Sequence, residues 1–326
     1  MNTRISLRMF QQHLPRQLNN NRRFISNVNS QPPILLLAED HSRPAAYHVL
    51  SRSLPTLKNR NYNTFMCEEI QGAGGTLDAV LEKSKIQAKR MQDLYEAAPE
   101  IMVPMSERYT LTGEEFLVAC LEELRKNPYI NPDKILSLPA KLLRHDPGRL
   151  RFYEILKGLD FAFKNLDENY SGSFPNTSSE YRQYLDTRDE QYIHEIVNAY
   201  HQKQGVIAVL GAMHLVPVPE ACPSSSAFYN FNREKRKVIC EKLDEQGVPY
   251  IGLFPFDSNH TPSSFLTKMW RKQTLIAHQT PDPSTVYSID IAGEQGVKNF
   301  LQTIEILTAA RTLDMQNDSI KNRRMR

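Results

Sequence analysis

The stretch Gly205-Val-Ile-Ala-Val-Leu-Gly-Ala-Met-His-Leu215 shows most clearly how this chain of 326 residues is organised. Its apolar run, Val206 to Leu210, is short and rich in β-branched residues, and Gly211 closes it. This pattern is typical of a buried strand in a parallel sheet. His214 follows three residues after Gly211. Because open α/β sheets bind ligands outside the carboxyl ends of their strands, His214 is a candidate for chemistry.

Two earlier stretches repeat this arrangement of an apolar run followed by titratable residues. The runs are Pro33 to Ala38 and Tyr62 to Cys67. Acids and a histidine come directly after them: Glu39 and His41 after the first run, and Glu68 and Glu69 after the second. We therefore expect the strands that end at Ala38, Cys67 and Leu210 to be parallel neighbours whose polar residues meet at one rim of the sheet.

The rest of the chain alternates between strand and helix patterns, which predicts an α/β fold with a mainly parallel central sheet flanked by helices. Further strands are expected at 249–254 and 286–291, and helices at 45–54, 188–204, 233–246 and 296–311. The block 76–180 is interpreted as a mostly helical insertion between the second core strand and the later strands. It includes an expected strand at 101–105 and expected helices at 76–97, at 116–126, from 131 and at 149–166. The single domain is expected to span 31–312, between a basic N-terminal tail, 1–30, and a basic C-terminal tail, 313–326.

Composition excludes several classes of protein. The four cysteines are scattered without a CxxC pair, which favours a reducing compartment such as the cytoplasm over a disulfide framework or a zinc knuckle. No run approaches eighteen apolar residues, so no transmembrane segment is expected. Neither tail carries a core-forming apolar period, so we expect both to be dispensable for folding.

Positive charge is concentrated at the two ends of the chain. Residues 1–38 contain five arginines and no acid, and residues 319–326 contain four basic residues. The body between them is net acidic, so we expect no nucleic-acid partner. The Arg-rich, acid-poor start has two interpretations, a basic tail or a mitochondrial transit peptide. A secreted effector is a further alternative for the location of the protein.

The order of these motifs resembles the superfamily that contains the TraB/GumN proteins, the TIKI proteases, the ChaN-like haem-binding lipoproteins and the erythromycin esterase-like enzymes. The superfamily motif Gly-Glu-x-His is matched by Ala38-Glu39-Asp40-His41, with alanine in place of glycine. Its second glutamate is best matched by Glu69-Ile70, with Glu68 as the near alternative. Its last motif is matched by Gly211 to Leu215, and the basic start of the preceding helix by Arg188-Asp189.

The resemblance implies a hydrolase-like site at the carboxyl ends of the strands. The candidate catalytic residues are Glu39, His41, Glu69 and His214, with Arg188 and Glu68 as substrate contacts. Two imidazoles and two carboxylates suit a divalent metal such as Mn, Co or Zn, held by His41, His214 and Glu69, with an activated water. The same inventory suits a metal-free site in which a histidine activates water and a glutamate orients it. The substrate class is a small molecule or a peptide. The alternatives are a non-catalytic protein that binds haem or another ligand, and an effector that acts through protein contacts.

Overall fold

The computed structural model describes eight segments of the chain, which are residues 31–39, 45–68, 74–82, 84–86, 147–168, 178–216, 237–257 and 286–324. The strand expected at 101–105 and the helices expected at 116–126 and from 131 lie outside these segments. So do His41 and Glu69 among the candidate site residues.

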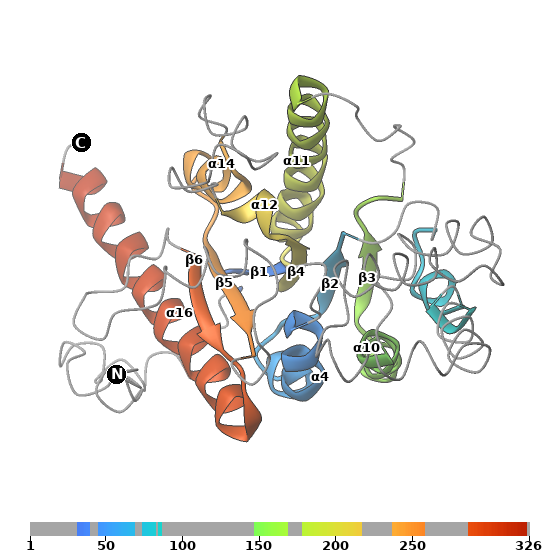
Figure 1. Cartoon of the computed structure of the whole chain (residues 1–326). Helices are drawn as coiled ribbons and strands as arrows, with labels where there is room; N and C mark the ends of the chain where they lie inside the picture. Colours follow the sequence, from blue (N-terminus) through green and yellow to red (C-terminus); the bar gives the residue numbers. More distant parts are fainter. Residues whose placement is uncertain are drawn as a thin grey trace, which may run out of the picture.

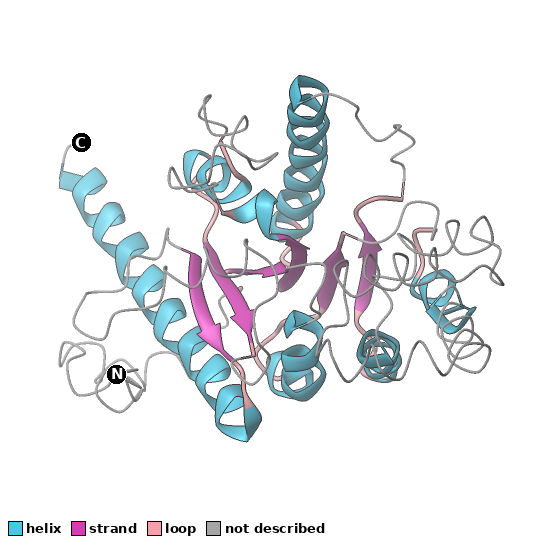
Figure 2. Ribbon diagram, viewed as in Figure 1, coloured by secondary structure: helices cyan, strands magenta, loops and turns pink. Residues whose placement is uncertain are grey.

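A six-stranded parallel sheet forms the centre of the described fold (Figures 1 and 2). The strands lie in the order β3-β2-β4-β1-β5-β6, and each of the five pairings is parallel. Their bounds are β1 Ile34–Glu39, β2 Thr64–Cys67, β3 Ala162–Asn165, β4 Val206–Gly211, β5 Tyr250–Phe256 and β6 Val286–Asp290. The expected α/β class is confirmed. So is the expectation that the strands ending near Ala38, Cys67 and Leu210 are neighbours, because β4 pairs with β2 on one side and β1 on the other.

Helices cover both faces of the sheet (Figure 1). One face carries α4 Ala45–Lys58, α10 Pro147–Gly158 and α16 Gly293–Arg324, and the other carries α11 Ser178–His201, α12 Ala212–Leu215 and α14 Ile239–Glu245. The side chains of β1 alternate between the two cores, with Leu35 and Leu37 in the core under α4 and α10, and Leu36 in the core under α11. A strand buried on both faces needs apolar residues at every position, which explains the unbroken run in the sequence.

The edge strand β3 corrects the helix expected over 149–166. The helix α10 ends at Gly158, Asp160 adopts φ 54°, and the chain then enters β3 beside β2. The apolar residues Phe152, Leu156, Leu159 and Phe163 keep a helical spacing across this boundary, so periodicity alone could not locate the turn.

The C-terminal helix corrects the helix expected over 296–311. Helix α16 begins at Gly293 and runs to Arg324. After Gly296 the sequence has no proline or glycine to stop a helix, so the helical backbone continues into the basic segment. Among the helices in the described segments, none is long and apolar enough to cross a membrane.

Candidate functional site

The carboxyl ends of β2, β4 and β1 place three of the expected motifs side by side. In the sheet register Glu39 lies opposite Gly211, and Cys67 lies opposite Val209. Glu68 extends the β2 edge by one residue, since its backbone N–H donates to the Val209 carbonyl at 3.1 Å. The chain then turns at Gly211 into the single turn of α12, which carries His214.

Glu68 is a buried carboxylate held by two donors from different elements. Its Oε1 accepts a hydrogen bond from Arg188 Nη2 at 2.7 Å, and its Oε2 accepts one from the backbone N–H of Gly211 at 2.8 Å. The side chain is only 3% exposed, and a buried carboxylate of this kind requires such donors. Glu68 therefore links helix α11 to the start of α12.

Arg188 bridges Glu68 to a second acid, Asp167, which follows the edge strand β3. The Nη2 atom of Arg188 lies 2.8 and 2.7 Å from the two oxygens of Asp167, and its Nε lies 3.2 Å from one of them. Its Nη1 donates to the Tyr184 hydroxyl at 3.0 Å. The guanidinium, 5% exposed, thus holds two carboxylates at one rim of the sheet.

His214 lies between two carboxylates. Its Nδ1 is hydrogen-bonded to Asp189 Oδ1, and its Nε2 lies 3.5 Å from Glu68 Oε2. Because an ionised carboxylate only accepts, the Asp189 contact places the ring proton on Nδ1. The neutral ring then presents the Nε2 lone pair to Glu68 Oε2, and among the described residues no hydrogen bond reaches Nε2. A water molecule or a hydroxyl group beside His214 Nε2 and Glu68 Oε2 has an acceptor for its proton in each of them.

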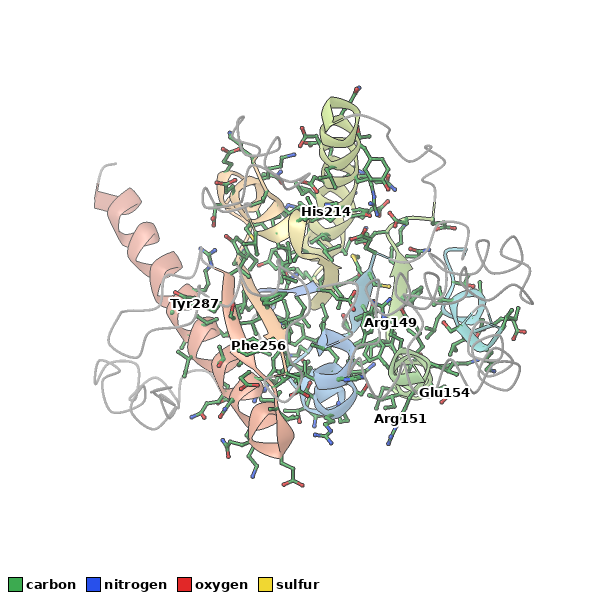
Figure 3. The ribbon with its side chains drawn as sticks, in the orientation of Figure 1. Arg149, Arg151, Glu154, His214, Phe256 and Tyr287 are labelled. Carbon is green, nitrogen blue, oxygen red and sulfur yellow. The ribbon has the colours of Figure 1, made fainter. Side chains whose placement is uncertain are left out.

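Tyr192 closes the cluster. Its hydroxyl donates to Asp167 Oδ1, and its ring lies 5.2 Å from the His214 ring, centroid to centroid. We call Glu68, Asp167, Arg188, Asp189, Tyr192 and His214 the α11-side cluster; each of these side chains is buried. His214 is labelled on the α11 side of the sheet in Figure 3.

Three carboxylates and one guanidinium make the α11-side cluster rich in negative charge. Burial and the charge of Glu68 raise the pKa of Asp167, against the opposing charge and hydrogen bonds of Arg188 and the hydrogen bond of Tyr192. Burial and the same Glu68 charge raise the pKa of Tyr192, so its hydroxyl keeps its proton. Burial alone would lower the pKa of Arg188, but Glu68, Tyr192 and Asp167 raise it overall. The guanidinium therefore stays charged.

Glu39 belongs to a different group of side chains. Its Oε1 accepts a hydrogen bond from Arg149 Nη2 at 2.6 Å, and both side chains are 2% exposed. The Arg149 guanidinium lies 4.5 Å from the centre of the Tyr47 ring. Because side chains alternate along a strand, Glu39 shares the face of Leu35 and Leu37, whereas Glu68 shares the face of Met66 in the other core. Figure 3 labels Arg149 on the α4 and α10 side of the sheet.

Of the candidate residues from the sequence, Glu68, Arg188 and His214 come together in the α11-side cluster. Glu39 is placed in the pair with Arg149, and the roles expected of His41 and Glu69 stay predictions because both lie outside the described segments. Four charged or polar partners were not candidates: Asp167, Asp189, Tyr192 and Arg149. A signal existed for Asp189, because it directly follows Arg188 in the match to the helix motif.

A metal site was expected at His41, His214 and Glu69. Of these three residues, the described segments contain only His214. Within the described segments, no group of three histidine, cysteine or acidic side chains is arranged to hold a metal ion. His214 could supply Nε2 to such a group, whereas both oxygens of Glu68 already accept hydrogen bonds.

Comparison with known proteins gives no family for this chain. No family model matches the sequence, and no curated protein matches it. Among solved structures, "The structure of the type III effector HopBA1" is similar over 79% of this chain and 88% of that chain, with 10% sequence identity and a TM-score of 0.36.

Proposed function

We propose that this protein is a hydrolase in which His214 activates a water molecule for attack on an ester, amide or phosphoester. The observation that carries the proposal is the arrangement of His214, with Nδ1 held by Asp189 and Nε2 placed 3.5 Å from Glu68 Oε2. A buried carboxylate that fixes the tautomer and orientation of a histidine is the arrangement that a general base requires. The resemblance to the TraB/GumN and erythromycin esterase-like superfamily adds to this proposal.

Four residues of the α11-side cluster have a role in the proposed reaction. Nε2 of His214 takes a proton from water, and the water oxygen forms a bond to the carbonyl carbon or phosphorus of the substrate. The imidazolium that results is stabilised by Asp189 at Nδ1 and by Glu68 beside Nε2. The bond to the leaving group then breaks, and the imidazolium returns the proton to that group. Arg188 orients Glu68. A direct contact between Arg188 and substrate, and roles for His41 and Glu69, complete the proposed site.

A second candidate is a ligand-binding protein or an effector that acts by protein contacts, in which the α11-side cluster only holds the helices to the sheet. The observation that favours it is the burial of the cluster, since His214 is 2% and Asp189 0% exposed. Under this alternative, haem or another ligand binds outside the α11-side cluster, or the protein acts by protein contacts without a ligand. The two candidates differ in what a change at His214 does to turnover.

The test is a screen of ester, amide and phosphoester substrates with the purified protein and three variants. His214→Ala and Asp189→Asn should lower kcat/KM by about 10²- to 10⁴-fold, the usual contribution of a general base. His194→Ala is the matched control, because His194 is an exposed histidine on α11, the helix that carries Asp189. Turnover that survives His214→Ala would overturn the proposed role of His214.

Elemental analysis and the absorbance spectrum of the same protein separate the remaining alternatives. A stoichiometric metal that is lost in His214→Ala would assign the activity to a metal site that includes this residue. A haem absorbance band without turnover on any substrate would favour the binding protein over the hydrolase. Turnover without bound metal would support the metal-free reaction given above.

A further inference from the structure

Tyr192 contacts three other members of the α11-side cluster: Asp167, His214 and Arg188. Its hydroxyl donates to Asp167, its ring lies 5.2 Å from the His214 ring at an interplanar angle of 54°, and the Arg188 guanidinium carbon lies 5.3 Å from the ring centre. The residue is 0% exposed. Its polar and apolar parts therefore act on different neighbours.

The helix α11 explains why one residue reaches all of them. Tyr192 lies four residues after Arg188 and three after Asp189, so the three side chains share one face of the helix. Arg188 reaches towards β2 and β3, and Asp189 reaches the ring of His214. Tyr192 lies one turn after Arg188, and its side chain contacts Asp167 and the His214 ring.

We infer that Tyr192 is a positioning residue for the proposed site. Its hydroxyl fixes the Asp167 carboxylate, which holds Arg188 and through it Glu68, and its ring fixes the plane of the His214 imidazole. Tyr192 thereby sets the spacing between Glu68 Oε2 and His214 Nε2. The inference rests on the proposed function for its consequence in turnover, but the positioning itself can be measured without a substrate.

The hydroxyl is tested by titrating the Asp167 carboxyl carbon by NMR in the wild-type protein and in Tyr192→Phe. The groups that face Asp167 in the described segments are Glu68 beyond β2, Arg188 and Tyr192 from α11, and Asn165 from its own strand. Loss of the hydroxyl removes a donor to the carboxylate, so the midpoint should rise by about one pH unit. Tyr200→Phe, eight residues further along α11, should leave it unchanged. An unchanged midpoint in Tyr192→Phe overturns the inference.

The ring is tested through the Nδ1 proton of His214, which gives a downfield NMR signal when it is hydrogen-bonded to Asp189. Tyr192→Phe keeps the ring and should keep the signal, whereas Tyr192→Leu should shift it or accelerate its exchange with water. Since Tyr192→Leu leaves a gap in the core and could unfold the protein, a second measurement uses the wild-type chain. Nuclear Overhauser contacts between the Tyr192 ring and the His214 ring are expected, and their absence overturns the inference.

Turnover separates this inference from the proposed function. If a substrate is found, Tyr192→Phe should move the acidic limb of the pH–rate profile to higher pH. The reason is that the Asp167 carboxylate of this variant is protonated at a higher pH and then releases Arg188. A profile that does not move contradicts the positioning role even if the enzyme is active. If no substrate is turned over while both NMR results hold, the proposed function fails and Tyr192 remains the residue that positions His214.

Discussion

At the scale of single residues, Glu68 accepts hydrogen bonds from Arg188 and from the Gly211 N–H, and it also lies beside His214 Nε2. Glu68→Gln removes the charge at nearly constant volume. We expect the free energy of unfolding to fall by about 1–3 kcal/mol, because the hydrogen bond to a charged donor is weakened while Asp167 still pairs with Arg188. Denaturant unfolding followed by circular dichroism measures the change.

The matched control for that substitution is an exposed acid on helix α11, which also carries the Glu68 partner Arg188. Glu190 pairs with Lys242 at 2.5 Å, and its side chain is 70% exposed. Glu190→Gln should change the stability by less than about 1 kcal/mol, as surface ion pairs do. Equal losses for the two substitutions would show that Glu68 is no more important than a surface charge.

Asp167 should make the stability depend on pH in a defined direction. Its pKa in the folded protein is raised from the usual 3.8, mainly by burial and by Glu68. The folded state therefore binds the proton more tightly than the unfolded chain. The resulting stability is fully present below pH 3.8 and is lost as pH rises through the raised pKa. Asp167→Asn should remove this loss of stability with rising pH. Urea unfolding midpoints of the wild-type protein and the variant, measured from below pH 3.8 upwards, test the expectation. Parallel curves of midpoint against pH for the two proteins would contradict it.

The sequence could name Glu68 and His214 because each follows a strand in a recognisable motif. It named Arg188 as the start of a helix expected over 188–204, whereas α11 already begins at Ser178 and Arg188 lies inside it. It could not name Asp167, because this residue follows β3, whose strand pattern is hidden by the helical spacing of Phe152, Leu156 and Phe163. Tyr192 was hidden for another reason. A tyrosine on the apolar face of a helix has the pattern of an ordinary core residue, and only the fold shows its contacts with His214 and Asp167.

At the scale of elements, the junction between α11 and β4 depends on a close approach at Gly205. The Gly205 N–H donates to the Asn63 side chain, and its carbonyl accepts the N–H groups of Asn63 and Thr64. A Cβ at Gly205 would lie 1.9 Å from the Asn61 carbonyl oxygen, which is backbone and cannot rotate away. We expect Gly205→Ala to cost more than about 2 kcal/mol of stability, since the start of β4 must move.

Gly158 provides the matched control for that substitution. It ends α10, and a Cβ there would meet nothing within 4 Å. Gly158→Ala should be neutral or stabilise by up to about 1 kcal/mol, because alanine loses less backbone freedom on folding. Thermal unfolding of both variants decides the matter, and a similar loss at the two positions would contradict the steric argument at Gly205.

The ion pair between Arg149 and Glu39 fastens α10 to the end of β1. Removing one partner leaves a buried charge, so Arg149→Met should destabilise the protein by about 3–5 kcal/mol. The double variant Arg149→Met with Glu39→Gln should lose clearly less than the sum of the single variants. A double-mutant cycle from denaturant unfolding measures the coupling, and additive losses would show that the two side chains do not depend on each other.

Most strands of the sheet could be predicted because each is a buried run bounded by polar residues, as at Val206 to Leu210. That the strands ending near Ala38, Cys67 and Leu210 are neighbours also followed, because the polar motifs after them were expected to meet at one edge of the sheet. The positions of β3 and of the end of α16 did not follow. An edge strand with exposed and half-buried residues has no strong pattern, and a helix without a stop residue gives no boundary.

At the scale of the whole molecule, contacts between residues far apart in the sequence tie the first described residues and helix α16 to the rest of the fold. The Gln31 side chain donates to the carbonyls of Tyr200 and Gln204, at the end of α11. Near the other end, Arg311 donates to Asp244 at 3.0 Å and to the Tyr250 carbonyl at 3.2 Å. Arg60 holds α16 further back, through the Leu301 carbonyl and Glu305.

These anchors lie inside residues 30–318, so a chain shortened to this range should keep its thermal midpoint. Gln31→Ala serves as the comparison, because it removes two hydrogen bonds that tie the start of β1 to α11. That loss of about 1–2 kcal/mol should lower the midpoint by roughly 2–8 °C. Differential scanning calorimetry of both proteins checks the expectation. If the thermal midpoint of the shortened chain falls as far as that of Gln31→Ala, residues outside 30–318 contribute to the stability of the fold. That result would contradict the expectation that both basic tails are dispensable for folding.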